Sequence, residues 1–327
     1  MKGAKMTRIT TPSTIAGLLA ALIVSFSPLV ATAEETAQKT FKSPAAAGEA
    51  LLASAKANDT DALIAIFGPG SKDLVFSGDP AADASLRERF VAAYEQKHEW
   101  KPAPDNLKIL IVGKDHWPFP IPLVETESVS HFDTERGREE VLDRRVGRNE
   151  LSAIQACLAF VDAEREYYAW NPMGGTPQYA RAIASADGKK NGLFWITGEG
   201  EKPSPLGALF AAARTEGYSA KEGPDAPYHG YRFRVLLKQG EEAHGGAVEY
   251  IMDGAMTKGF ALLAWPAKYG ASGVMTFLVN QTGLVYEKNL GPDTSEITAK
   301  IDAFDPDISW DVVSGEALNP LGTDDAS

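Results

Sequence analysis

The feature that most constrains the fold is a change to two-residue periodicity near residue 231. An apolar series alternates with a largely basic one, Tyr231, Phe233, Val235 and Leu237 against Arg232, Arg234, Leu236 and Lys238. Successive side chains of a strand point to opposite faces of a sheet, so this pattern predicts a strand with one buried face. Further strands are expected at residues 248–252, 260–265, 274–279 and 284–287, with a tight hairpin at 253–254. Together they predict an antiparallel meander.

A long helix is expected just before these strands, at residues 149–170. Asn149 is a candidate N-cap, and Glu150 follows it in the first turn, where the helix dipole favours negative charge. The apolar stripe of Ile154, Leu158 and Val161 should lie across the sheet. The sequence therefore predicts an α+β fold.

A cluster of helices is expected nearer the N-terminus, at residues 44–56, 62–67 and 82–98. Short strands should follow at 107–112 and 130–134, with an edge strand or extended loop at 116–124 and a terminal helix at 295–304. The predicted organisation is a leader at 1–33, helices with short strands at 34–146, a helix-plus-sheet domain at 147–313 and a polar tail at 314–327.

The first 33 residues have the three-part layout of a secretory signal peptide. A basic start of Lys2, Lys5 and Arg8 precedes an apolar run at 15–30, and small residues end at Ala33. A retained membrane anchor is the alternative, but the run is shorter than the ~20 apolar residues that span a bilayer. We therefore expect a periplasmic or extracellular protein, cleaved near Ala33, with no transmembrane segment in the mature chain.

The mature chain is strongly acidic. Removing residues 1–33 leaves 29 basic against 44 acidic residues. Nucleic acids and anionic lipids are bound mainly through Lys and Arg, so this balance argues against both as partners. Cys157 is the only cysteine and excludes an internal disulfide. It could be a reactive thiol, but its place in an apolar helical stretch favours a buried packing residue.

Five stretches resemble the bacterial family catalogued as domain of unknown function 2950. They are residues 68–80, 147–169, 228–236, 259–291 and 304–310. The resemblance implies an exported bacterial protein and brings no activity or site residues with it.

The C-terminal half also resembles, more weakly, the globular part of type IV pilin-like proteins. The matching residues are Asn149-Glu150, Gly230-Tyr231-Arg232-Phe233, and Ser272-Gly273 with Phe277, Val279 and Gly283. Pilins carry a long apolar helix before this domain, whereas residues 136–148 of this chain are crowded with charge. The comparison therefore implies a fold without filament assembly.

Candidate binding residues are aromatic side chains or histidines beside loops rich in Pro and Gly: Trp117, His229, Tyr231, Trp265 and Tyr269. Such residues suit a carbohydrate, peptide or protein surface, although aromatic residues also serve as core. Asp302, Asp305 and Asp307 form a weak candidate calcium site, since an EF-hand's Gly and terminal Glu are missing. No other metal or cofactor is expected, because the histidines lack metal-ligand spacing.

No hydrolase or nucleotide-binding signature is present, so no catalytic residue is assigned. We expect an exported, soluble cell-envelope protein with a non-enzymatic binding or scaffolding role, whose partner is another envelope protein or polymer. The alternative is an envelope hydrolase with a site assembled from distant residues. A deep pocket that gathers His and carboxylates would favour the enzyme, and a flat aromatic patch would favour the binder.

Overall fold

The protein is described from a computed structural model, in which residues 37–219 and 226–318 are placed. The predicted signal peptide, residues 1–33, lies outside the described residues, as does the tail beyond 318. The described residues belong to one unit of the chain, Thr36–Ser327.

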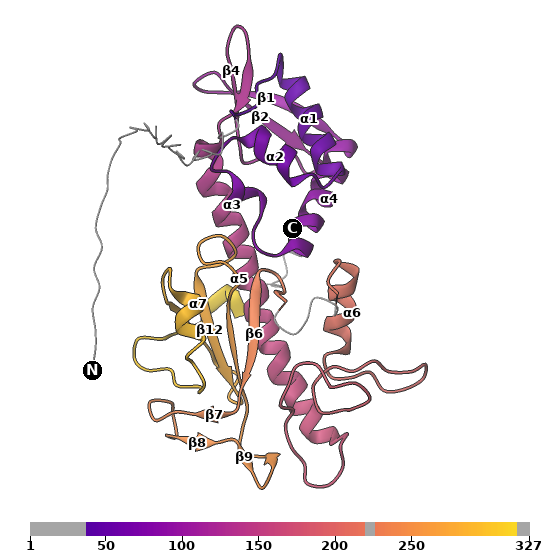
Figure 1. The fold of residues 1–327 in the computed structure, drawn as a ribbon, viewed down its shortest axis with the longest axis vertical. Helices are drawn as coiled ribbons and strands as arrows, with labels where there is room; N and C mark the ends of the chain where they lie inside the picture. Colours follow the sequence, from indigo (N-terminus) through magenta and orange to yellow (C-terminus); the bar gives the residue numbers. More distant parts are fainter. Residues whose placement is uncertain (1–36, 220–225, 319–327) are drawn as a thin grey trace, which may run out of the picture. The chain divides into compact units, whose positions relative to one another are not determined.

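The fold is of the α+β class (Figure 1). The helices are α1 (Pro44–Lys56), α2 (Thr60–Phe67), α3 (Lys72–Val75), α4 (Pro80–Gln96), α5 (Thr134–Trp170), α6 (Gly207–Thr215) and α7 (Thr294–Thr298). The strands before residue 133 are β1 (His98–Ala103), β2 (Leu107–Val112), β3 (Trp117–Pro118), β4 (Leu123–Glu125) and β5 (Ser130–Phe132). The later strands are β6 (Tyr231–Leu236), β7 (Lys238–Gln239), β8 (Val248–Glu249), β9 (Ile251–Met252), β10 (Ala255–Met256), β11 (Ala261–Pro266), β12 (Met275–Asn280), β13 (Val285–Asn289) and β14 (Asp311–Val312).

The N-terminal helices begin at polar caps, and α2 and α4 each start two residues earlier than predicted. The side chains of Ser43, Asp59 and Asp79 accept hydrogen bonds from backbone N–H groups in the first turns of α1, α2 and α4. The helices and the sheet β1 to β5 enclose a core that includes Leu51, Ile66, Leu110, Leu123 and Phe132. Strand β1 was not expected, because the third helix was predicted to continue to His98.

Helix α5 begins at Thr134, so the predicted start at Asn149 is wrong. The charged residues 136–148 are helical because their side chains find partners on neighbouring elements. Arg138 forms an ion pair with Asp73 at 2.7 Å, and Arg145 donates to the carbonyls of Asp73 and Leu74. Asn149 is buried in mid-helix and donates to the carbonyl of Ser272 at 2.8 Å. The predicted boundary between residues 146 and 147 lies inside this single helix.

A five-stranded antiparallel sheet lies against the second half of α5, in the order β14-β13-β12-β11-β6 (Figure 1). The expected helix-on-sheet packing is present: Ile154 and Val161 belong to one buried core with Leu262 and Phe277, and Leu158 packs against it. Glu150 fixes the helix along this sheet, because its Oε1 accepts from the N–H groups of Val274 and Met275, both at 2.9 Å.

Two details of the predicted meander are wrong. Residues 248–252 stay outside the five-stranded sheet and form two-stranded pairs, β7 with β8 and β9 with β10, of which the second closes the hairpin predicted at 253–254. Leu236 is buried and Leu237 is exposed, the reverse of the prediction. The sheet is covered on both faces, since Arg234 donates to the carbonyls of Thr298 and Ile301, so both side-chain series of β6 meet protein.

The terminal helix α7 is shorter than predicted. The carbonyls of Thr298 and Ile301 accept from Arg234, and the N–H of Phe304 donates to the carbonyl of Lys238. Residues 299–304 therefore bond to the sheet instead of continuing the helix. Within the described part of the chain, no helix is both long enough and apolar enough to cross a membrane.

Candidate functional site

A two-residue turn, His229–Gly230, begins strand β6 and lies where the two cores meet. Both residues have positive φ, 48° and 75°, and Tyr228 and Tyr231 pair across them. Positive φ at both central positions is the conformation of a type I′ hairpin, in which Gly is favoured and His is uncommon. A Cβ on Gly230 would meet the side chains of Asn149 and Ser272, so the second position needs glycine for space as well.

Asp79 holds this turn against helix α4. Its Oδ2 accepts from the N–H of Gly230 at 2.8 Å and from the hydroxyl of Tyr218 at 2.9 Å, while its Oδ1 caps α4 through the N–H of Ala82. The hydroxyl of Tyr218 in turn accepts from the N–H of His229 at 2.9 Å. One buried carboxylate thus connects the N-terminal helices, the segment after α6 and the start of the sheet.

His229 faces Glu216, with 3.0 Å between Nε2 and Oε2. This buried carboxylate oxygen has no hydrogen bond among the described residues, so we assign the imidazole proton to Nε2, the nitrogen that faces it. Burial lowers the pKa of His229, although Glu216 and Asp79 act in the opposite direction. The ring is therefore neutral at pH 7, because the charged form is the one that burial disfavours.

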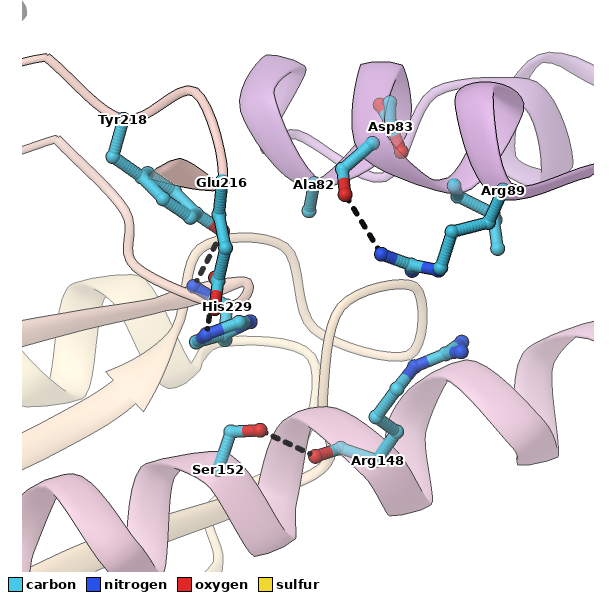
Figure 2. A pocket seen from close by; sticks show the side chains of 10 residues that line it. Ala82, Asp83, Arg89, Arg148, Ser152, Glu216, Tyr218 and His229 are labelled. Atoms are coloured by element: carbon cyan, nitrogen blue, oxygen red, sulfur yellow. Dashed lines mark hydrogen bonds and ion pairs between the residues drawn. The ribbon is translucent and has the colours of Figure 1, made fainter. Parts of the chain in front are cut away.

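Glu216, Tyr218 and His229 line a small cavity of about 250 Å³ (Figure 2). Its charged and hydroxyl-bearing wall comes from α4, α5 and the segment after α6, and includes Arg89, Arg148, Ser152, Glu216, Tyr218 and His229. Partial burial lowers the pKa of Arg148, and the positive charge of Arg89 lowers it further. Burial also raises the pKa of Asp83, whose Oδ2 accepts from the N–H of Ser77 at 3.0 Å.

The small cavity does not pair a nucleophile with a base. The hydroxyl of Ser152 donates to the carbonyl of Arg148 at 3.0 Å, one turn back on its own helix, and not to His229. A serine hydrolase would need that hydroxyl within hydrogen-bond reach of the imidazole. The arrangement can bind and orient a polar group more readily than it can attack one.

A second, larger cavity of about 600 Å³ lies beside it and is mostly apolar. Its apolar wall comes from α5, α6, the segment before α6 and the first strands of the sheet, and includes Phe160, Ile183, Leu206, Leu209, Phe210 and Leu262. Tyr218 lines both cavities. The volume lies within the range of ordinary small-molecule pockets, about 300–1,000 Å³.

Three arginines line the larger cavity. Arg234 donates to the carbonyls of Thr298 and Ile301, and the other two are Arg181 and Arg214. Arg214 lies over the ring of Phe194, 5.6 Å from its centroid, and Arg181 donates to the carbonyl of Gly254. Neither forms an ion pair with a carboxylate within residues 37–219 and 226–318. The lining thus combines an apolar interior with two cations whose charge is not neutralised.

The family model described as "Protein of unknown function (DUF2950)" matches residues 38–313. The chain belongs to this family. Searches of the curated proteins and of the solved structures each found no match. The DUF2950 match covers both cores and both cavities.

The structure does not gather the predicted aromatic residues of this DUF2950 protein into one patch. Trp117 is 41% exposed on β3, where the guanidinium of Arg144 lies over its ring. Tyr231 is fully buried and donates to the carbonyl of Met275 at 2.8 Å, so it is a core residue. Trp265 lies under the guanidinium of Arg234, and the hydroxyl of Tyr269 donates to Asn289 at 3.1 Å. Of the five candidates, His229 is the one that lines either of the two cavities described above.

The three aspartates of the weak calcium candidate are each engaged elsewhere. Asp302 pairs with Lys238 at 2.8 Å, Asp305 accepts from the N–H groups of Glu242 and Ala243, and Asp307 accepts from Ser309. Across the described ranges, no group of three or more His, Cys, Asp or Glu side chains is arranged to hold a metal ion.

The partners of His229 were not predicted from the sequence. Arg89, Arg148, Glu216 and Tyr218 come from separate segments and share no motif. Arg148 did lie in a stretch, 147–169, that carries the family resemblance, but this gave no indication of which side chains face a cavity.

Proposed function

We propose that this DUF2950 protein is exported to the cell envelope and there binds, without catalysis, an apolar molecule that carries an anionic group. The observation that carries the proposal is the apolar cavity of about 600 Å³ with two unneutralised arginines in its lining. Transfer of apolar surface from water would supply the affinity, and the arginines would orient the anionic end.

The position of the cavity supports a binding role. Its floor includes Phe160 of α5 and Leu262 of β11, which are rigid, buried parts of the second core. Its wall includes Leu209 and Phe210 of α6, a helix with a single buried residue, Ala213. A rigid floor with a lightly packed wall suits a site that must admit and release a ligand.

The anionic group is inferred from charge. The chain is acidic, with a formal net charge of −12, so an anion approaching at random is repelled. Arg181 and Arg214 place positive charge in the lining of the apolar cavity. A neutral apolar ligand would gain no affinity from these two arginines, and a cationic ligand would be repelled by them.

Export rests on the N-terminal pattern at residues 1–33 and on the family resemblance. The similarity to pilin-like domains remains part of this proposal. It is consistent with α5 lying along an antiparallel sheet, and with the contact between Asn149 and Ser272, two residues that carry the resemblance. A scaffolding role would follow from that similarity, whereas the cavity favours a ligand.

The hydrolase alternative has one observation in its favour, the approach of His229 to Glu216 inside the small cavity. It lacks an activated nucleophile, because the hydroxyl of Ser152 is bonded to its own helix. We therefore place binding first.

The experiment is a titration of the mature chain with 1-anilinonaphthalene-8-sulfonate, an apolar dye with one anionic group, followed by displacement with laurate and with dodecanol. We expect saturable fluorescence, with laurate displacing the dye at lower concentration than dodecanol. Ala213→Trp, which fills the cavity, should abolish the signal, whereas Ala212→Trp, on the exposed side of the same helix, should leave it intact.

A second pair of variants tests the charge. Arg214→Gln should weaken laurate several-fold and leave dodecanol unchanged, and Arg165→Gln, on α5 away from the cavity, should change neither. Equal dye binding in the two tryptophan variants would refute the site. Export is tested separately, by fractionating cells and reading the N-terminus, which should begin near Glu34 in the soluble envelope fraction.

A further inference from the structure

Arg89 and Arg148 approach the small cavity from two different helices. Arg89 extends from α4 and Arg148 from α5, and Figure 2 shows both guanidinium groups directed into the space between these helices. Two cations that face one empty space repel each other, and the pKa of Arg148 is lowered in part for this reason. An anion bound between the two guanidinium groups would lower the free energy of this arrangement.

Neighbouring arginines on the same helices are already engaged. Arg138 and Arg144 of α5 form ion pairs with carboxylates, and Arg145 donates to backbone carbonyls. Arg148 has no ion pair among residues 37–219 and 226–318, and Arg89 donates only to the hydroxyl of Ser85 at 2.7 Å. Their guanidinium donors are therefore available to a ligand.

The remaining lining supplies further polar atoms. Ser85 places a hydroxyl group on α4, whereas the hydroxyl of Ser152 already donates to the carbonyl of Arg148 and Nδ1 of His229 can only accept. Asp83 is turned to Ser77, and Glu216 faces the imidazole. Two arginines and two carboxylates thus line the cavity. Both carboxylates have partners, whereas neither arginine forms an ion pair among the described residues, so the unpaired charge in the lining is positive.

We propose that the small cavity binds a phosphate group between Arg89 and Arg148, either as inorganic phosphate or as the phosphate end of a larger molecule. The planar fork of a guanidinium matches two oxygens of a tetrahedral phosphate, so two arginines from opposite walls can hold one group by four hydrogen bonds. A volume of about 250 Å³ admits that group but not an acyl chain. The proposal does not depend on the larger cavity, since the lining residues that carry it are different.

The test is isothermal titration calorimetry of the mature chain at constant ionic strength with sodium phosphate, with glycerol 3-phosphate, and with vesicles of phosphatidylcholine containing phosphatidic acid. Constant ionic strength removes the general screening of a charged protein from the comparison. Equal affinity for inorganic phosphate and for glycerol 3-phosphate, without binding to the vesicles, indicates a site for the free anion. Tighter binding of the ester or of the vesicles indicates that the phosphate belongs to a larger molecule.

Arg89→Gln and Arg148→Gln should each weaken phosphate at least tenfold, whereas Arg165→Gln, whose partner is Asp162, should leave it unchanged. Thermal unfolding gives an independent check. Without phosphate, Arg148→Gln should raise the melting temperature, because it removes like-charge repulsion, and phosphate should stabilise the wild type but not this variant. Absence of binding by all three phosphate probes, or binding that survives both substitutions, would overturn the proposal.

Discussion

Asp79→Ala should cost far more stability than the loss of a helix cap. The carboxylate caps α4, and it also accepts from the N–H of Gly230 and the hydroxyl of Tyr218 at 2.8 and 2.9 Å. Loss of a cap costs about 1 kcal/mol. A buried donor left without its acceptor costs about 1–3 kcal/mol, and the substitution leaves two. We expect a loss of about 3–7 kcal/mol, a large share of the roughly 5–15 kcal/mol by which domains are stable.

The chain contains a matched control for this measurement. Asp59 caps α2 through the N–H of Ala62 at 2.9 Å, in an exposed position, and its side chain has no other partner among the described residues. Asp59→Ala should therefore cost only about 1 kcal/mol. The measurement is urea unfolding, followed by tryptophan fluorescence and by circular dichroism. Equal losses in the two variants would refute the view that Asp79 joins the two cores.

A double-mutant cycle of Asp79→Ala with Tyr218→Phe separates two contributions of Asp79 to stability. One is the cap on α4, and the other is the hydrogen bond to Tyr218. The phenylalanine removes the hydroxyl that donates to Asp79 and accepts from the N–H of His229. Residues within one hydrogen-bond network show coupling of about 0.5–3 kcal/mol. Additive losses in Asp79→Ala and Tyr218→Phe would mean that the two groups act separately.

Three further predictions concern the second core. Phe277→Ala should cost about 3–5 kcal/mol in urea unfolding, because Phe277 is fully buried under α5, and a loss below 1 kcal/mol would contradict the packing. Cys157 is fully buried and its pKa is raised to about 12, so native thiol labelling should be slow and Cys157→Ser should cost about 1–3 kcal/mol; rapid labelling would disprove its burial. Burial raises the pKa of Glu164 well above 4.5, so the wild type should lose stability as pH rises above about 4.5, where the unfolded state releases its proton first. The free energy of unfolding of Glu164→Gln, relative to that of the wild type, should therefore increase between pH 4 and pH 8. A difference that stays constant over this range would contradict this account.

Local signals in the sequence predicted the elements that local contacts stabilise. Ser43 and Asp59 cap helices through their own first turns, and the hairpin at 253–254 is set by two residues. The first half of α5 was missed for the opposite reason. Its charged residues are held by Asp73 and by the carbonyls around α3, partners that are more than 60 positions away in the chain.

The same distinction holds for the candidate site. His229 attracted notice because aromatic residues and glycine surround it in sequence, and it does line a cavity. Tyr231 stands two residues away with similar neighbours, yet it is core, since strand direction decides which side chain faces inward. The two cavities depend on how α4, α5 and α6 are brought together, and no spacing along one segment encodes that.

Helix α5 runs without interruption for 37 residues, and both cores depend on it. Val141 and Leu142 pack against the first core, and Cys157 and Phe160 belong to the second. One residue inserted or deleted between these pairs would rotate one half of the helix by about 100° relative to the other and shift it by about 1.5 Å. The helix therefore sets a fixed angular phase between the two cores. Changes in chain length within the family should occur in loops such as residues 171–206, and be absent from residues 143–152.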